Sequence, residues 1–199
     1  MHSQSRSGTL RLRSMKRSVL LLTLLSAVLT GCAGSKGAVS RGAGELSRFV
    51  MPVRGIQPYE LTPNFGAARD NGARKHEGLD IMAPMGREVL ACVSGKILTK
   101  KWNDLGGNTI WLQGDDGKVY YFAHLSAYRE GISDGERVRA ADVIGFVGNT
   151  GDAQGKSPHL HFEVHDTRGG PAYDPFPILT QDGILVMSIP VTPLPKKKK

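Results

Sequence analysis

Two histidines separated by a single residue, His159 and His161, are the positions in this sequence best suited to chemistry. Residues two apart on a β-strand point to the same face, so both imidazoles and Glu163 would share one face while the apolar residues between them pack into a core. Paired imidazoles on a rigid strand suit metal binding or proton transfer. For an isolated pair of this kind, the alternative is two exposed polar side chains with no joint role.

A second candidate pair is His76 and Asp80. Glu77 follows His76, but the zinc-binding helix motif His-Glu-x-x-His needs a histidine at its fifth position, where Asp80 stands. Gly78 also disfavours a helix. On an extended strand, positions 76, 78 and 80 share a face, so His76 and Asp80 can line one groove.

Two further histidines follow residue 76, namely His124 and His165. His124 ends a stretch of β-type residues, and His165 lies two residues beyond Glu163. We expect His165 and Glu163 to be exposed strand residues. The alternative is that they hydrogen-bond to a metal ligand from behind and orient it.

Short β-type runs after about residue 49 must position these side chains. Strands are expected over residues 88–93, 95–102, 109–113, 118–124, 143–147 and 159–165, and Asp115-Asp116-Gly117 predicts a hairpin turn. Residues 174–177 predict a turn that ends the domain, and the apolar stretch 184–189 can add an edge strand. No amphipathic helix is indicated after residue 32. With 25 glycines and 11 prolines, the chain favours short strands and tight turns over long helices.

The N-terminal region has the pattern of a secretion signal. Lys16 and Arg17 precede eleven mostly apolar residues, 19–29, and small residues follow. Eleven helical residues span only about 16 Å, roughly half of a bilayer core, so a permanent transmembrane helix is not expected. Because the signal is complete from Met15, translation can begin there.

Residues 29–32 (Leu-Thr-Gly-Cys) resemble the lipobox of bacterial lipoproteins, which would make Cys32 the lipidated first residue of the mature chain. Two or more acyl chains anchor a protein stably. Ala33 follows Cys32, which in Gram-negative bacteria resembles sorting to the outer membrane, facing the periplasm. The Gly-rich stretch after Cys32 predicts a flexible tether. With Cys32 lipidated, Cys92 has no disulfide partner and is expected to be a buried thiol.

The net charge of +8 is concentrated at the two ends of the chain. Five basic residues lie in the first 31 residues and four lysines form the tail at 196–199, so the part between them is close to neutral. A basic surface for nucleic acid is therefore not expected. The lysine tail is expected to be solvated.

In order, these motifs resemble the lysostaphin/LytM-type zinc metallopeptidases, which are bacterial cell-wall endopeptidases. The resemblance covers about residues 61–179. It rests on His76-x-x-x-Asp80, His124 within 121–126 and His159-x-His161, and on the flanking stretches 64–66, 78–81, 145–151 and 157–164. One departure is that Ala67 and Ala68 precede Arg69, whereas in the family an arginine typically follows the Phe-Gly pair closely.

This resemblance implies that His76, Asp80 and His161 bind one zinc ion, with a water at the exchangeable fourth position. Such a zinc polarises the scissile carbonyl and lowers the pKa of its water. His124 and His159 would then be catalytic. One would act as general base, and the other would stabilise the oxyanion or protonate the leaving amine; the sequence leaves open which does which. The implied fold is an all-β, mostly antiparallel, sandwich-like domain.

The implied function is hydrolysis of the peptide cross-links of peptidoglycan, with the protein held at the membrane through Cys32. The alternative is a non-enzymatic regulator that activates cell-wall amidases on the same fold. Some such relatives have lost the metal ligands, all of which are present here. The expected organisation is a signal peptide at 1–31, a lipidated tether at 32–48, a zinc metallopeptidase domain at 49–180 and a C-terminal extension at 181–199. Residues 106–108 and 152–156 are expected to edge the groove.

Overall fold

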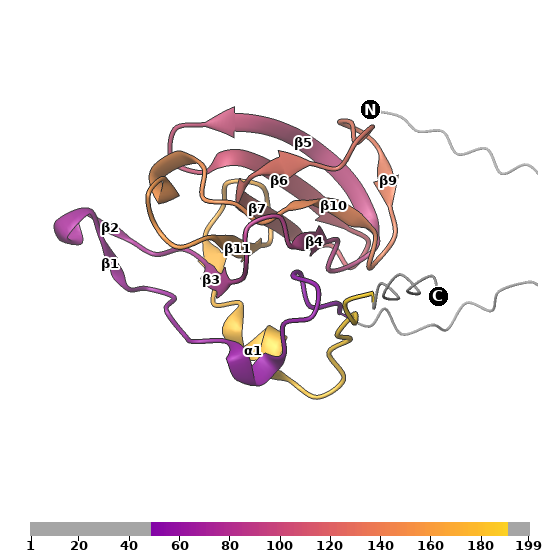
Figure 1. Cartoon of the computed structure of the whole chain (residues 1–199), viewed down its shortest axis with the longest axis horizontal. Coiled ribbons are helices and arrows are strands. Elements are labelled where there is room, and N and C mark those ends of the chain that lie inside the picture. The colour runs from indigo at the N-terminus through magenta and orange to yellow at the C-terminus, as the bar shows by residue number, and fades with distance from the viewer. Residues whose placement is uncertain (1–48, 191–199) are drawn as a thin grey trace, which may run out of the picture. The chain divides into compact units, whose positions relative to one another are not determined.

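A seven-stranded antiparallel sheet forms the centre of the structure, a computed structural model that describes residues 49–190 (Figure 1). The strands follow the order β12-β11-β7-β6-β5-β9, and β3 pairs with the first half of β11. Their bounds are Leu79–Met82 (β3), Gly95–Asn103 (β5), Gly107–Gly114 (β6), Val119–Leu125 (β7), Arg137–Val138 (β9), His159–His165 (β11) and Ala172–Tyr173 (β12). The predicted signal, Cys32, the tether and the lysine tail lie outside the described residues.

A smaller sheet of order β4-β10-β8 shares one hydrophobic core with the large one. Its strands are Glu88–Leu90 (β4), Ala127–Tyr128 (β8) and Val143–Phe146 (β10). Val89 and Ile144 from this sheet and Ile97, Phe122 and Phe162 from the large sheet are fully buried in the same cluster. The apolar residues that alternate along each strand therefore meet between the sheets. This mostly antiparallel, all-β architecture confirms the expected fold class.

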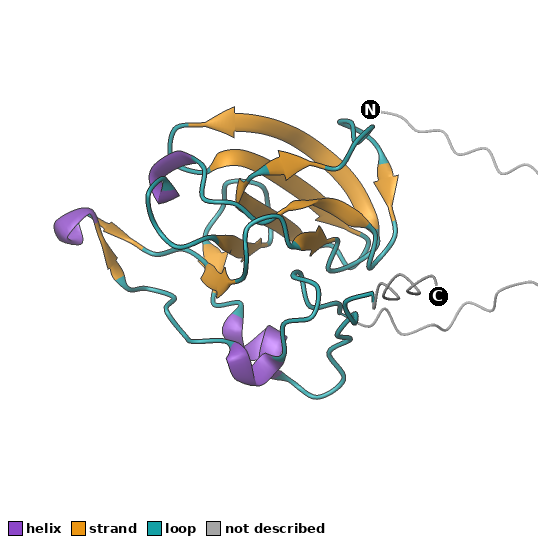
Figure 2. Ribbon diagram, in the orientation of Figure 1, coloured by secondary structure: helices purple, strands orange, loops and turns teal. Residues whose placement is uncertain are grey.

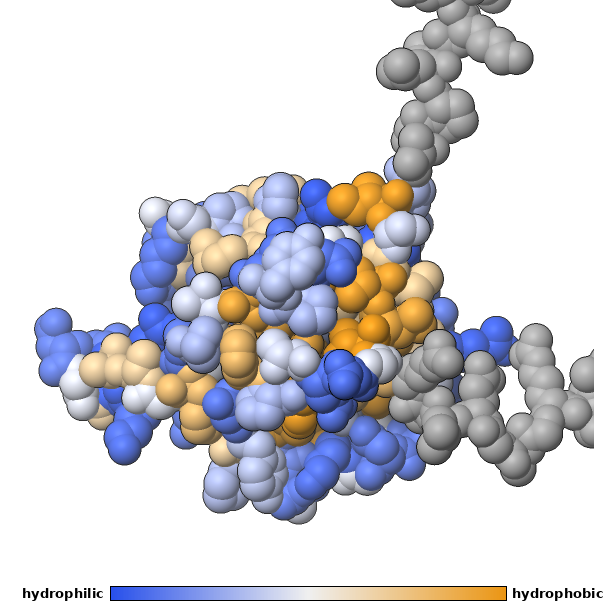
Figure 3. Space-filling view, turned by 90° about the horizontal axis from the view of Figure 1, so that it is seen from below, coloured by the Kyte–Doolittle hydropathy of each residue, from blue (hydrophilic) through white to orange (hydrophobic). Residues whose placement is uncertain are grey.

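A short hairpin projects from the body of the domain at the left of Figure 1. It consists of β1 (Ala68–Arg69), the 3-10 turn η2 (Asp70–Gly72) and β2 (Arg74–Lys75). Hydrophilic residues cover its tip (Figure 3). The other helical pieces of the described chain are also short: η1 (Pro58–Glu60), η3 (Gly151–Ala153) and α1 (Phe176–Thr180) (Figure 2). Within residues 49–190, no helix has the length and apolar character to cross a membrane.

Two predictions about the C-terminal part are wrong. Residues 174–177 do not form a domain-ending turn, because helix α1 begins at Phe176. The Asp174 carboxylate accepts a hydrogen bond from the Phe176 N–H at 2.9 Å. Prolines also suit the first turn of a helix. Residues 184–189 form no edge strand but only one parallel bridge, between Leu185 and Val50. The predicted strands, the hairpin turn at Asp115-Asp116-Gly117 and the burial of Cys92 are confirmed, with strand ends differing by a few residues.

Candidate active site

The pairing of β3 with β11 places Asp80 directly opposite His161. Directly paired residues project to the same face of a sheet, so their side chains meet. His76 joins them from the segment between β2 and β3, which is not a strand, contrary to the expected continuous run from 76 to 80. Gly78 lets this segment pass close to β11, because a Cβ there would lie 2.5 Å from the Phe162 carbonyl oxygen and 2.8 Å from Cε1 of His161.

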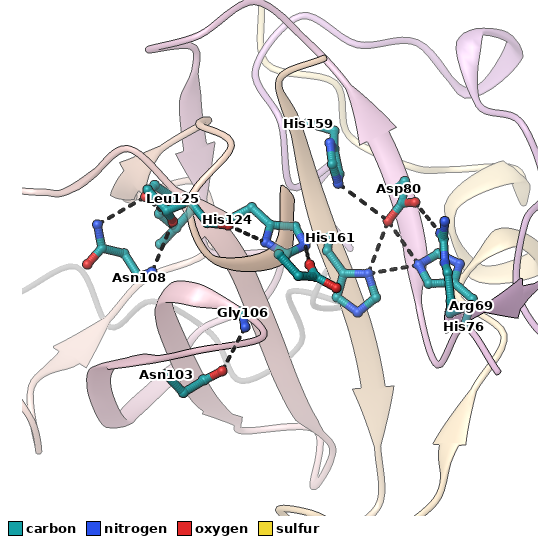
Figure 4. Close-up of polar contacts among 12 residues, drawn as sticks. Arg69, His76, Asp80, Asn103, Gly106, Asn108, His124, Leu125, His159 and His161 are labelled. Atoms are coloured by element: carbon teal, nitrogen blue, oxygen red, sulfur yellow. Dashed lines mark hydrogen bonds and ion pairs between the residues drawn. The ribbon is translucent and has the colours of Figure 1, made fainter. Parts of the chain in front are cut away.

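His76, Asp80 and His161 form a tight group, which we call the metal-ligand cluster (Figure 4). Nε2 of His76 lies 2.9 Å from Oδ1 of Asp80 and 2.8 Å from Nδ1 of His161. Nδ1 of His161 lies 3.0 Å from the same Oδ1. Three potential ligand atoms from two separate parts of the chain thus converge on one point.

The remaining ring nitrogens of the cluster show why a cation fits there. Nδ1 of His76 donates to the carbonyl oxygen of Asn64 at 2.9 Å, and Nε2 of His161 donates to Oε1 of Glu163 at 2.7 Å. Since each ring keeps its proton on that side, the converging nitrogens present lone pairs to each other and to a carboxylate. Such an arrangement is repulsive without a cation or an added proton between the atoms. Two imidazole nitrogens and one carboxylate oxygen are also a donor set typical of catalytic zinc.

Asp80 is fixed by partners on its second oxygen. Oδ2 accepts hydrogen bonds from Arg69 at 2.5 Å and from the side-chain amide of Asn64 at 3.2 Å. The Asp80 backbone N–H donates in turn to Oδ1 of Asn64 at 3.2 Å. Oδ1 is therefore left to face the two imidazoles. Arg69 makes this contact from the projecting hairpin.

His124 is aimed at the groove by an irregularity in β7. Strict alternation would put His124 on the core face with Phe122, because Ala123 pairs with His161 on the groove face. The β6–β7 register slips between Asn108 and Ile110, so that β7 carries an extra residue there. His124 adopts a left-handed backbone conformation with φ 62°. Bulges of this kind re-aim side chains next to active sites, and this one turns the imidazole to the groove.

His124 and His159, which we call the free histidine pair, are held alike. Nδ1 of His124 donates to the carbonyl oxygen of Thr150, and Nδ1 of His159 donates to that of Ser157, both at 2.8 Å. Their ring centroids are 4.9 Å apart. With the proton on Nδ1, each ring turns an Nε2 lone pair toward the groove. Among residues 49–190, neither Nε2 has a partner within hydrogen-bonding distance: Nε2 of His124 lies 3.7 Å from Asp152, and Nε2 of His159 lies 3.9 Å from Asp80.

The two groups differ in electrostatics. Burial and the neighbouring imidazoles of His161 and His159 lower the pKa of His124 to about 4. Burial also lowers the pKa of His161, but hydrogen bonds to Asp80 and Glu163 outweigh it and raise the pKa to about 9. Burial raises the pKa of Asp80, but hydrogen bonds that the rings of His161 and His76 donate when they are protonated more than reverse this, so the pKa of Asp80 stays well below its ordinary value.

Both groups line one pocket in the described part of the chain. The β5–β6 loop contributes Leu105 and Gly106 to its wall, and the loop after η3 contributes Lys156. Arg74 of the hairpin pairs with Asp152 at 3.3 Å and joins the hairpin to the η3 segment. The remaining lining residues are Arg69, Lys75, Glu77, Asn103, Tyr121, Ala123, Asp152 and Glu163. The pocket thus includes residues from both predicted edges, 106–108 and 152–156.

Glu163 and His165 are not exposed, and the expectation for them is wrong. Their exposed fractions are 8% and 3%. Alternation along β11 places them on the face of His161, and Trp111 of β6 packs against His165 with ring centroids 5.2 Å apart. Their spacing from His161 was the available signal in the sequence, but the cover over that face comes from distant strands. The five predicted catalytic and metal residues all lie around the pocket, and their roles stay predictions; Cys32 lies outside the described residues.

Comparison with known proteins places this geometry in context. The model of peptidase family M23 matches residues 74–175, about half of the chain. An L-Ala–D-Glu endopeptidase of Bacillus subtilis is 37% identical over 139 residues, which cover 66% of this chain and 42% of that protein. Lysostaphin of Staphylococcus simulans is 36% identical over 145 residues, 71% of this chain and 27% of lysostaphin. The chain therefore matches less than half the length of these relatives.

Solved structures agree with this relationship. The crystal structure of the catalytic domain of lysostaphin from Staphylococcus simulans superposes with a TM-score of 0.53 at 32% identity, covering 62% of this chain and 96% of that domain. A zinc-containing peptidase from Vibrio cholerae superposes with a TM-score of 0.51 at 25% identity, covering 59% of this chain and 36% of that protein.

Proposed function

Because the chain belongs to peptidase family M23, we propose that it is a zinc-dependent endopeptidase that hydrolyses peptide cross-links of bacterial peptidoglycan. The observation that carries the proposal is the meeting of the metal-ligand cluster and the free histidine pair in one pocket, with ring centroids of His124 and His161 5.7 Å apart. A regulator without chemistry would need neither group. The peptidoglycan relatives named above support the substrate class.

In the proposed reaction, His76, Asp80 and His161 hold the zinc. When bound, zinc polarises the scissile carbonyl and lowers the pKa of a water molecule. His124 and His159 both turn Nε2 to the groove, so the ring with a lone pair there accepts a proton from the attacking water, and the other, when it carries a proton on Nε2, donates it to the oxyanion or the leaving amine. Their Nδ1–H bonds to backbone carbonyls fix the tautomer that this transfer needs.

We propose that the protein works in the cell envelope as a lipoprotein. The lipobox-like residues 29–32 support lipidation of Cys32, and Ala33 after it supports sorting to the outer membrane, facing the periplasm. The Gly-rich stretch 33–48 would then keep the catalytic domain near the membrane. In a Gram-negative wall the substrate would be a cross-link that contains diaminopimelate.

The test is digestion of purified sacculi by the zinc-loaded protein, with and without chelator, followed by mass analysis of the released muropeptides. We expect chelator-sensitive loss of cross-linked species and no loss with His161→Ala. Cleavage between L-Ala and D-Glu, the bond in the name of the Bacillus subtilis relative, would leave fragments of other masses. Binding to sacculi without release, or stimulation of a separate amidase by metal-free protein, would contradict the proposal.

A further inference from the structure

A buried carboxylate–imidazole pair, Glu163 and His165, lies directly behind His161. The side chains follow one another along one face of β11, at every second residue. Oε1 of Glu163 accepts from Nε2 of His161 at 2.7 Å, and Oε2 accepts from Nε2 of His165 at 2.7 Å. Nδ1 of His165 then donates to the carbonyl oxygen of Gly170 at 2.7 Å. A continuous hydrogen-bonded chain thus connects the metal-ligand cluster to the turn between β11 and β12.

The directions of these hydrogen bonds are determined by the available donors. Gly170 offers only a carbonyl oxygen, and a carboxylate can only accept, so His165 carries a proton on each nitrogen. Glu163 therefore lies between two N–H donors, and its charge is balanced by His165. An anionic Glu163 can receive a hydrogen only from Nε2 of His161. That leaves the lone pair of His161 on Nδ1, which is the nitrogen facing His76 and Asp80.

The surroundings hold this chain in place. Val164 and His165 pair with Tyr173 and Ala172 of β12, which anchors the end of β11. Trp111 packs against the His165 ring. A purely structural ion pair would be satisfied by Glu163 and His165 alone, yet one oxygen of Glu163 is used on a ring of the metal-ligand cluster. Groups in this position behind a ligating imidazole fix its tautomer and orientation.

We propose that Glu163 and His165 are positioning residues that set the tautomer and orientation of His161 for zinc. His165 acts through Glu163, whose carboxylate it holds and neutralises. The inference rests on the proposed function, because it takes the metal-ligand cluster as the zinc site.

The main test is zinc affinity, measured by equilibrium competition with a chromophoric chelator. Glu163→Gln keeps the shape but offers His161 either an amide N–H or an oxygen, so it no longer selects one tautomer. We expect zinc binding to weaken roughly 10- to 100-fold, the usual loss when a group that hydrogen-bonds to a metal ligand is removed. The matched control is Tyr120→Phe, which removes another hydrogen bond to a carboxylate, a partly buried one from the Tyr120 hydroxyl to Asp116 at 2.5 Å, next to β11 but away from the zinc ligands. It should leave zinc affinity unchanged.

The second test asks whether His165 acts through Glu163. His165→Leu should weaken zinc binding less than Glu163→Gln does, and should add no further loss in the Glu163→Gln background. Proton and nitrogen NMR of the zinc-loaded wild type should show the Nε2–H of His161 shifted downfield by its short hydrogen bond to Glu163, and Glu163→Gln should move this signal upfield. If Glu163→Gln fails to fold, His165→Leu and the wild-type NMR signature decide the matter.

The outcomes separate this inference from the proposed function. If the wild type binds no zinc, both fail. If the wild type binds zinc and hydrolyses sacculi while Glu163→Gln and His165→Leu bind it as tightly as Tyr120→Phe does, only the positioning role is overturned. Equal losses from His165→Leu in both backgrounds would also overturn it, since they would show that His165 does not act through Glu163.

Discussion

The metal-ligand cluster and the free histidine pair lie within one pocket, yet their imidazoles are set up for opposite tasks. In the cluster, Nε2 of His76 and Nδ1 of His161 face each other and Oδ1 of Asp80 at 2.8–3.0 Å. In the pair, the Nε2 atoms of His124 and His159 have no carboxylate oxygen of the described part of the chain closer than 3.7 Å. The same side chain is therefore crowded by lone pairs in one group and open to the groove in the other.

The surroundings of His161 and His124 shift the pKa values of the two imidazoles in opposite directions. Despite its burial, the pKa of His161 is raised to about 9 by Asp80 and Glu163, while burial and adjacent rings lower the pKa of His124 to about 4. A site that attracts a positive charge in the metal-free protein suits a cation. A ring with a pKa this low is neutral near pH 7, so its Nε2 lone pair is available to a proton from a reacting water. The role of each histidine is thus determined by what surrounds the ring nitrogen that faces the pocket.

The largest effect is expected for substitutions in the metal-ligand cluster. His161→Ala and Asp80→Ala each remove a ligand and should reduce hydrolysis of sacculi to the level of buffer. Added zinc should raise the unfolding temperature of the wild type and leave that of these variants unchanged, because only the wild type binds it. Hydrolysis retained by either variant would show that the cluster is not the metal site.

A smaller but still large effect is expected for the free histidine pair. His124→Gln and His159→Gln should each lower the rate roughly 10²- to 10⁴-fold, the range for loss of a general acid or base. Zinc binding should persist in both, because neither ring belongs to the cluster. The measurement is initial rate at saturating zinc, with unfolding temperature as the check on folding. Recovery of full rate by excess zinc would contradict the assignment.

The electrostatic contrast predicts a pH effect on the metal-free protein. NMR titration should place the pKa of His124 near 4, below its usual 6.5. The unfolded chain takes up this proton first, so stability that is present above about pH 6.5 is lost as the pH falls toward 4. The loss is about 3 kcal/mol. Denaturant titrations should show that His124→Gln lacks this part of the pH dependence; an unchanged slope would speak against a neutral, buried His124.

The smallest effect is expected for Arg69→Gln. Arg69 holds Oδ2 of Asp80, but its side chain is 35% exposed and Asn64 also bonds Oδ2. A partly exposed ion pair contributes about 1 kcal/mol or less, so zinc affinity should fall by roughly fivefold at most. Arg137→Gln, which removes an exposed pair with Asp115, is the matched control and should change nothing. A loss of zinc affinity as large as that caused by Asp80→Ala would contradict this minor role and show that the metal-ligand cluster depends on Arg69.

The sequence predicted the framework because it is encoded locally. Alternation of apolar residues predicted the strands, and the family resemblance at His76, Asp80 and His161 predicted the cluster that β3–β11 pairing assembles. Even the error of extending a strand through His76 had no consequence for the cluster. A non-strand segment that passes Gly78 brings His76 to the same place.

Features that depend on distant partners could not be predicted in the same way. Alternation alone would put His124 in the core. The bulge opposite Thr109, where the backbone of His124 has φ 62°, turns the imidazole to the groove. The burial of Glu163 and His165 depends on Trp111 and on the β12 turn, which are brought to β11 by the folded sheet. Periodicity assigns a face to a side chain but does not say what covers that face.

Metal content tests the division between the two groups most directly. Zinc should be measured in purified protein for the wild type and for single substitutions at all five positions. We predict about one zinc per chain in the wild type, His124→Gln and His159→Gln, and almost none in His76→Ala, Asp80→Ala and His161→Ala. Loss of zinc from either His124→Gln or His159→Gln, or its retention by any of the other three, would contradict the account.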